Sequence, residues 1–214
     1  GVRALRYVRS LACRAVADAR GGPSGPVHLN WPFREPLDPG EPGPALAAPG
    51  AMAAEGRNAA WTSVAPGISL ASAEELDALL EISRQNERGL LVCGPLVPDA
   101  RLSGAIARLA RLTGWPVVAD PLSQLRRGPH VDGTPILAHA DLLLRDEEIA
   151  RTWAPDVVVR FGDSPVSKAL RLALEARPPE HLVLVDPDRV WHDPSHLASR
   201  VVVADPALLC EAWG

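Results

Sequence analysis

The single lysine of the chain stands at the start of an expected helix. Lys168 is one of 22 lysines and arginines, and all the others are arginines. It follows the string FGDSPVS, in which Ser164 is expected to cap the helix and Pro165 to lie in its first turn. A helix N-terminus attracts anions and mildly disfavours a cation. The sequence therefore favours a contact between Lys168 and an anionic ligand over a role in helix stability, although a lysine without a ligand remains the alternative.

A pair of adjacent arginines, Arg126 and Arg127, lies in the polar segment DPLSQLRRGPH, residues 120–130. A guanidinium group can bind a carboxylate through two parallel hydrogen bonds, which makes Arg126 and Arg127 candidates for such a contact. A solvated surface loop explains the same residues equally well, so both interpretations stay open.

The string HDPSH places His192 and His196 four residues apart, a spacing with which a helix can hold a metal ion. Pro194 interrupts a regular helix at this point, and no third ligand is evident. We therefore interpret the segment as a surface turn.

Neither common phosphate-binding fingerprint is present. The segment CGPLVPDA, residues 93–100, lacks the later glycines of G-x-G-x-x-G and the string G-K-[ST]. It is expected to be a plain strand-to-helix turn, so a Rossmann-like shape would not imply dinucleotide binding. No Ser/His/Asp or Cys/His arrangement with supporting context occurs either.

Composition disfavours several classes of protein. A net charge of −4 argues against a general nucleic-acid binder. No apolar run approaches the ~20 residues of a membrane span. Cys13, Cys93 and Cys210 form no C-x-x-C motif, so they support neither a zinc site nor a redox motif, and a cytoplasmic setting fits best. Cys93 lies in an apolar run and is expected in the core.

Short apolar strands alternate with amphipathic helices from about residue 63 onward. The expected strands lie within residues 89–95, 115–121, 155–163, 181–188 and 199–205. The expected helices lie within residues 72–87, 99–114, 146–154, 164–176 and 206–213. The strands are rich in Val and Leu and do not alternate, which is typical of parallel strands covered on both faces. The fold class is therefore α/β, with a doubly wound Rossmann-like parallel sheet over residues 63–214.

The N-terminal part has a different organisation. Residues 1–20 show helical spacing of apolar residues and are followed by Gly21 and Gly22, which favours a core-packed helix over an arginine-rich transit peptide. The string VHLN, residues 27–30, reads as a strand. Residues 38–62 are rich in Pro, Gly and Ala without a period, as in a linker.

Four strings are similar to one enzyme family. GPVHLNWPFREPL, residues 25–37, resembles the end of the pyrimidine-binding domain of thiamine-diphosphate enzymes. Residues 119–126 (ADPLSQLR), 140–147 (ADLLLRDE) and 160–170 (RFGDSPVSKAL) are similar to the central domain of one branch. That branch comprises the menaquinone-pathway synthases that make 2-succinyl-5-enolpyruvyl-6-hydroxy-3-cyclohexene-1-carboxylate.

The resemblance implies that the chain is a piece of such an enzyme: residues 1–37 from the N-terminal domain, a linker at 38–62, and the central domain at 63–214. The intact enzyme would use thiamine diphosphate and Mg²⁺ to decarboxylate 2-oxoglutarate and add the product to isochorismate. Neither cofactor nor any catalytic or metal-binding residue is expected in this piece, which alone is expected to be inactive.

Site residues also follow from the resemblance. The loop at 163–168 faces the active site in this family, so Lys168 and its neighbour Ser167 are expected to bind substrate, with Arg126 as a weaker candidate. Some relatives carry a basic residue where this chain has Ala169, which weakens a one-to-one transfer. The intact enzyme is expected to be a cytoplasmic homodimer or homotetramer.

Two alternatives remain. One is the central domain of another thiamine-diphosphate carboligase, similar to acetolactate synthase, against which the strings PFREPL and PVSK argue. The other is a non-catalytic ligand-binding α/β domain, which bound flavin or nucleotide would favour.

Overall fold

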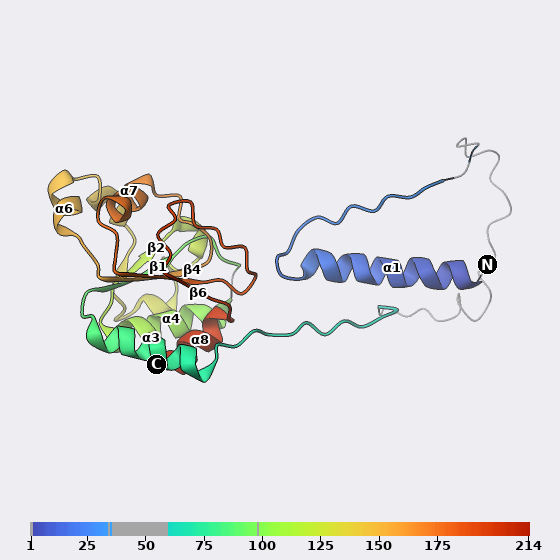
Figure 1. Ribbon diagram of the computed structural model, residues 1–214, viewed down its shortest axis with the longest axis horizontal. Helices are drawn as coiled ribbons and strands as arrows, with labels where there is room; N and C mark the ends of the chain where they lie inside the picture. Colours follow the sequence, from blue (N-terminus) through green and yellow to red (C-terminus); the bar gives the residue numbers. More distant parts are fainter. Residues whose placement is uncertain (1, 34, 36–59, 98) are drawn as a thin grey trace. The chain divides into compact units, whose positions relative to one another are not determined.

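The computed structural model describes residues 2–33, 35, 60–97 and 99–214. Contacts between residues divide the chain into two compact units, residues 1–67 and residues 68–214 (Figure 1). No helix in the described part of the chain is long and apolar enough to cross a membrane.

The first unit contains one long helix, α1 (Val2–Arg20), which confirms the helix expected there. The guanidinium carbon of Arg9 lies 5.0 Å from the ring centroid of Trp61. The Thr62 backbone N–H donates a hydrogen bond to Cys13 Sγ at 3.4 Å. No described side chain of α1 is buried, and Tyr7 is 63% exposed. The expectation of a core-packed helix is therefore wrong for the described residues, because the short segment at 60–67 covers only part of the helix surface.

The strand expected over residues 27–30 is not formed. Residues 24–33 have no regular secondary structure. A strand forms only where a neighbour completes its hydrogen bonds, and the described residues of this unit supply none. Most of the expected linker falls on residues 36–59, outside the described residues, and the assignment of residues 1–37 to a pyrimidine-binding domain stays a prediction.

The second unit is built on one parallel sheet of six strands in the order β3-β2-β1-β4-β5-β6. The strands are β1 (Gly89–Cys93), β2 (Val117–Ala119), β3 (Ile136–Leu137), β4 (Val157–Phe161), β5 (His181–Val185) and β6 (Arg200–Val202). All pairs are parallel, and the order reverses between β1 and β4. The predicted doubly wound α/β fold is confirmed. The sequence missed β3, because two half-buried residues at a sheet edge show no periodicity.

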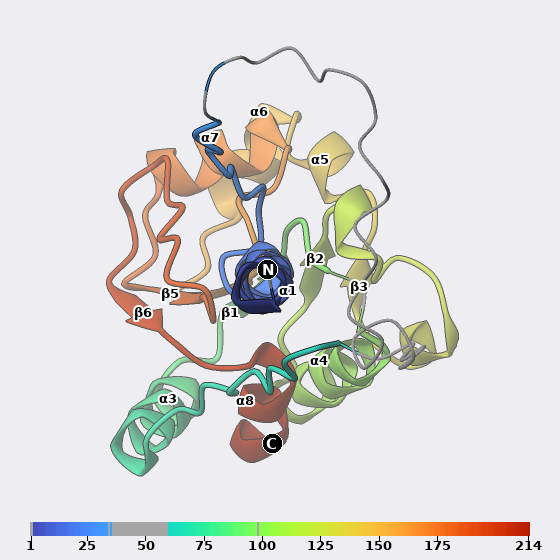
Figure 2. The same cartoon turned by 90° about the vertical axis from the view of Figure 1, so that its right-hand side faces the viewer.

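Helices cover both faces of the sheet (Figures 1 and 2). One layer holds α3 (Ala73–Gln85), α4 (Ala100–Thr113) and α8 (Pro206–Trp213). The other holds α5 (Ala140–Leu143), α6 (Glu147–Thr152) and α7 (Lys168–Ala176). Short 3-10 turns at Pro121–Ser123 and Pro129–Val131 follow β2.

Each layer encloses its own apolar core. The core under α3, α4 and α8 contains Cys93 and the edge-to-face pair Trp115 and Trp213, whose ring centroids are 6.3 Å apart. The core under α5 and α7 contains Leu170 and Leu182. Because both faces of every central strand are buried, continuous Val and Leu runs were the right signal for this sheet.

Candidate functional site

The carboxyl ends of the parallel strands place four loops at one edge of the sheet. At the point where the strand order reverses, the loops after β1 and β4 touch through their backbones. The Gly94 N–H donates to Phe161 O at 3.0 Å, and the Asp163 N–H donates to Pro95 O at 3.0 Å. A Cβ atom added to Gly94 would lie 1.8 Å from Asp163 O. Gly94 is therefore needed for this close approach, and its N–H is not available to a phosphate.

A buried carboxylate holds a third loop to the same corner. Asp120, which follows β2, is 4% exposed. Its Oδ1 accepts from the Leu122 N–H at 2.8 Å, and its Oδ2 accepts from the Val166 N–H at 2.9 Å. Its own N–H donates to Cys93 O at 2.8 Å. Asp120 thus joins the loop that carries Arg126 to the loop that leads into α7.

Helix α7 begins three residues later than the sequence indicated. Ser167, rather than Ser164, is its N-cap, and Lys168 is its first residue. A cap at Ser164 would accept the N–H of Val166 or Ser167, and the Val166 N–H donates to Asp120 Oδ2 instead. The placement of Lys168 in the first turn is confirmed, and the cap at Ser164 is wrong.

The hydroxyl group of Ser167 is engaged on both sides. It accepts from the Leu170 N–H at 3.1 Å and donates to Asp141 Oδ1 at 2.6 Å. A serine hydroxyl has a single proton to donate. In this arrangement Ser167 therefore has no second proton for a substrate carboxylate.

The Asp141 carboxylate accepts hydrogen bonds from both Ser167 and Arg145. Its Oδ2 accepts from Arg145 Nε at 3.0 Å, and Arg145 Nη2 lies 2.8 Å away. The pKa of the Asp141 carboxyl is lowered by the hydrogen bond from Ser167 first, and then by Arg145 and the nearby charge of Arg126, against an opposing effect of burial. The carboxylate is thus held in its charged form.

Lys168 faces a cavity of about 670 Å³ beside α5, α6 and α7. The charged residues of its lining are Asp141, Arg145, Glu147, Arg151, Lys168 and Arg177. Four of these carry a positive charge and two a negative charge, and the remaining lining is apolar. Such a cavity suits a small organic anion that also has an apolar part.

Arg126 lies near the same corner but is not among the residues that line this cavity. Its Nε–H donates to Ala119 O at 2.7 Å, which fixes the side chain over the end of β2. Of the three residues expected to bind substrate, Lys168 lines the cavity and Ser167 precedes it as the cap of α7. Arg126 lies close enough for its charge to lower the pKa of Asp141, but it does not line the cavity. Arg127 is exposed.

A second cavity, of about 620 Å³, lies between the loops after β1, β4 and β5. Five aspartates line it together with Arg160 and His192. Arg160 is 8% exposed, and burial lowers the pKa of its guanidinium, opposed mainly by Asp193. The acidic lining makes this cavity the poorer site for a carboxylate substrate.

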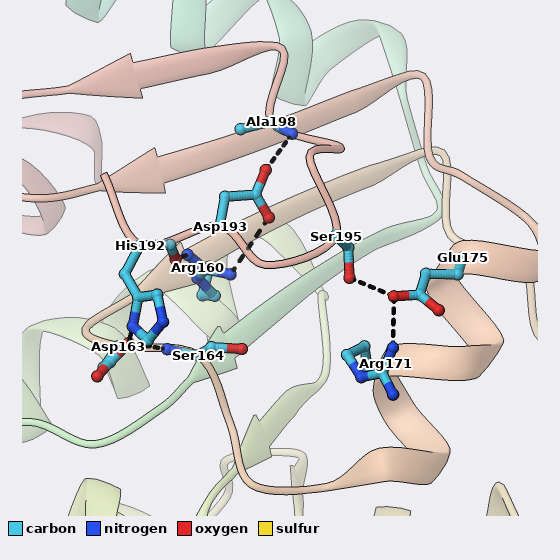
Figure 3. Close-up of polar contacts among 9 residues, drawn as sticks. All are labelled: Arg160, Asp163, Ser164, Arg171, Glu175, His192, Asp193, Ser195 and Ala198. Atoms are coloured by element: carbon cyan, nitrogen blue, oxygen red, sulfur yellow. Dashed lines mark hydrogen bonds and ion pairs between the residues drawn. The ribbon is translucent and has the colours of Figure 1, made fainter. Parts of the chain in front are cut away.

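Figure 3 shows the hydrogen bonds and ion pairs that hold the loop between β5 and β6, part of which lines this cavity. His192 Nδ1 contacts Asp163, and the His192 carbonyl accepts from Arg160. Arg160 Nη1 lies 3.9 Å from Asp193 Oδ1, and Asp193 Oδ2 accepts from the Ala198 N–H at 2.8 Å.

On the α7 side of the same loop, Ser195 Oγ donates to Glu175 Oε1 at 2.6 Å, and Arg171 donates to the same oxygen at 2.7 Å. These contacts join the loop to the helix that Lys168 begins.

The HDPSH segment forms a turn, as the sequence indicated, and not a helix. Asp193 is buried and paired with Arg160 within the protein. Among the residues that the structure describes, no group of three or more His, Cys, Asp or Glu side chains could hold a metal ion.

Sequence reasoning missed Asp120, Asp141 and Arg160. A signal existed for Asp120, since an aspartate directly after a buried strand lies at the ligand-binding edge of an α/β sheet. No local pattern singled out Asp141, because its role depends on a hydrogen bond with Ser167, which is 26 residues away in the chain.

The amino-acid sequence of residues 56–213 matches the family described as the middle domain of thiamine pyrophosphate. Curated relatives similar to the chain are named 2-succinyl-5-enolpyruvyl-6-hydroxy-3-cyclohexene-1-carboxylate synthase. The protein of Bacillus velezensis is 41% identical over 97% of this chain and 34% of its own length. That of Geobacillus kaustophilus is 42% identical over 96% of the chain and 34% of its own length. That of Chloroflexus aurantiacus is 38% identical over 97% and 34%. The chain thus spans about a third of the length of these relatives.

Proposed function

Because the chain belongs to the family described as the middle domain of thiamine pyrophosphate, we propose that it is the central domain of a thiamine-diphosphate-dependent synthase of menaquinone biosynthesis. The intact protein decarboxylates 2-oxoglutarate and transfers the succinyl-semialdehyde unit to isochorismate, which makes it a transferase. The shared name of the relatives supports this product. It also favours this branch over an acetolactate-synthase-like carboligase.

The observation that carries the proposal is the position of Lys168. It is the first residue of α7 and lines a cavity with an excess of positive charge. Both substrates are carboxylate anions, so an ammonium group at this position can bind them directly. Arg126 supplies a second cation at the same corner.

Ser167 supports the site in a different way from the one the resemblance implied. Its proton is donated to Asp141, so in the arrangement described it acts as the cap of α7 beneath Lys168. A contact between Ser167 and substrate would require its hydroxyl to leave Asp141.

We infer that the described residues of this chain do not hold the cofactors. The described part contains no group of His, Cys, Asp or Glu side chains suited to a metal ion, and the Gly94 N–H is already paired. We therefore place thiamine diphosphate and Mg²⁺ on other parts of the longer protein. The chain alone is inactive for that reason.

The remaining assignments concern assembly and location. The intact enzyme is a homodimer or homotetramer, which light scattering after size-exclusion chromatography measures. It acts in the cytoplasm, and the free state of Cys13, Cys93 and Cys210 supports a reducing compartment.

The test uses a full-length protein that carries this chain, with thiamine diphosphate and Mg²⁺ supplied. Turnover of 2-oxoglutarate but not pyruvate is expected, and preference for pyruvate would move the protein to the acetolactate-synthase-like branch. Lys168→Ala is expected to raise the KM for 2-oxoglutarate or isochorismate about tenfold, the loss of one charge-assisted contact. Arg84→Ala, a cation of the opposite layer in the last turn of α3, is the control and should change neither KM.

A further inference from the structure

We propose that Asp141 is a positioning residue, which holds the N-terminus of α7 and thereby sets where Lys168 stands. The inference rests on the proposed function of Lys168 as a substrate contact. Asp141 itself need not touch substrate, because its effect passes through Ser167.

Both carboxylate oxygens of Asp141 are engaged in ways that orient the group. Oδ1 accepts from Ser167 Oγ at 2.6 Å, and Oδ2 accepts from Arg145 Nε at 3.0 Å. Arg145 lies one turn further along the chain, and both its Nε and its Nη2 contact Oδ2, the oxygen that Ser167 does not use. The acceptor that Ser167 meets is therefore fixed in direction.

Ser167 transmits this orientation to the helix. Its hydroxyl rotates to suit its partners, and donation to Asp141 leaves an oxygen lone pair directed at the Leu170 N–H, 3.1 Å away. That bond satisfies one of the free N–H groups of the first turn of α7. Lys168 lies between the two bonded residues, so the direction in which its side chain leaves the backbone depends on this cap.

A second carboxylate holds the residues just before the cap. Asp120 Oδ2 accepts from the Val166 N–H, two residues ahead of Lys168. Asp120 is buried, so its loss disturbs the whole corner, whereas the Asp141 side chain is 37% exposed. Asp141 is therefore the member of the pair whose removal can test positioning without opening the core.

The experiment compares Asp141→Ala, Asp141→Asn and Asp146→Ala in the full-length protein. Asp146 caps α6 in the same layer by accepting from the Glu148 and Ile149 N–H groups, and it is the matched control for loss of a capping aspartate. Asparagine at 141 keeps one oxygen acceptor for Ser167 and serves as the conservative variant.

Amide hydrogen exchange tests positioning independently of catalysis. In Asp141→Ala, exchange in peptides covering residues 168–171 is expected to accelerate at least tenfold, while Asp146→Ala leaves these peptides unchanged. Unchanged exchange in Asp141→Ala would overturn the inference, whatever Lys168 does.

Steady-state kinetics tests the consequence for substrate binding. Asp141→Ala is expected to raise about fivefold to tenfold the same KM that Lys168→Ala raises, with a change in kcat below twofold. Asp141→Asn should stay within about threefold of the unmodified protein. In the double variant Lys168→Ala/Asp141→Ala, the second change should add less than twofold, because its effect passes through the missing ammonium group.

The outcomes separate the two proposals. If Lys168→Ala changes neither KM, the proposed function of Lys168 fails, and the exchange data alone decide on positioning. If Lys168→Ala raises a KM but Asp141→Ala does not, or if the two effects multiply, positioning through Asp141 is overturned while the substrate contact stands.

Discussion

Asp120 Oδ2 accepts a hydrogen bond of 2.9 Å from the Val166 N–H, although the two residues are 46 positions apart in the chain. The bond joins the end of β2 to the turn before α7. The same carboxylate also accepts from the Leu122 N–H, and the Asp120 N–H donates to Cys93 O. One buried aspartate therefore fixes the distance between the two segments that carry Arg126 and Lys168.

Replacement of this carboxylate should be costly. Asp120→Ala leaves the Leu122 and Val166 N–H groups without their partner and is expected to lower the free energy of unfolding by about 3 kcal/mol. Asp120→Asn keeps one acceptor oxygen and should cost less. Urea denaturation followed by circular dichroism measures both, and a loss below about 1 kcal/mol for the alanine variant would contradict the role given to Asp120.

The contact between the loops after β1 and β4 makes a second prediction. The added methyl group in Gly94→Ala would lie 1.8 Å from the Asp163 carbonyl oxygen, which belongs to the backbone and cannot turn aside. A loss of about 3 kcal/mol in stability is expected. Thermal unfolding monitored by tryptophan fluorescence checks this value.

The matched control is Gly104→Ala on α4, where an added Cβ meets no atom within 4 Å. Glycine is unfavourable inside a helix, so this variant should gain roughly 0.5–1 kcal/mol. Equal effects of the two substitutions would show that the loop contact is not close.

The link between the β5–β6 loop and α7 should depend on pH. The hydrogen bond from Ser195 first, and then Arg171, lower the pKa of the Glu175 carboxyl below its usual value of 4.5. A group whose pKa is lower in the folded state stabilises the fold above its unfolded pKa. That stabilisation is lost as the pH falls from about 4.5 through the lowered pKa of the folded state.

Glu175→Gln should therefore lose less stability than the unmodified chain between pH 6 and pH 3. Guanidinium denaturation at the two pH values measures the difference. Glu87→Gln, in the turn before β1, is the control. If the Glu175→Gln variant loses as much stability between pH 6 and pH 3 as the unmodified chain, then Glu175 does not contribute to the acid sensitivity of the fold.

Much of the second unit was predictable from local patterns. Ser72 accepts from the Glu75 N–H as the cap of α3, and Gly114 ends α4 with a φ of 72°; both lie at the edges of the helix ranges expected from the sequence, 72–87 and 99–114. These positions depend on interactions within four residues, so neighbouring residue types decide them. The strands were also predictable, because a strand that is buried on both faces of a sheet consists of consecutive apolar residues.

The errors fall where distant partners decide. Ser167 rather than Ser164 caps α7, and Asp120 accepts the Val166 N–H that a cap at Ser164 could have bonded. The strand expected at residues 27–30 does not form, because strands need partners and the described part of its unit provides none.

The sequence by itself determined the α/β class, the parallel sheet, and the presence of one lysine in the first turn of a helix, because periodicity and capping are local properties of the chain. Only the tertiary structure decided that Ser167 donates its proton to Asp141, that Asp120 joins two loops, and that Lys168 borders a cavity with excess positive charge. Those relationships join residues between 26 and 46 positions apart. They exist because parallel strands bring their carboxyl ends to one edge, where side chains from separate loops satisfy one another.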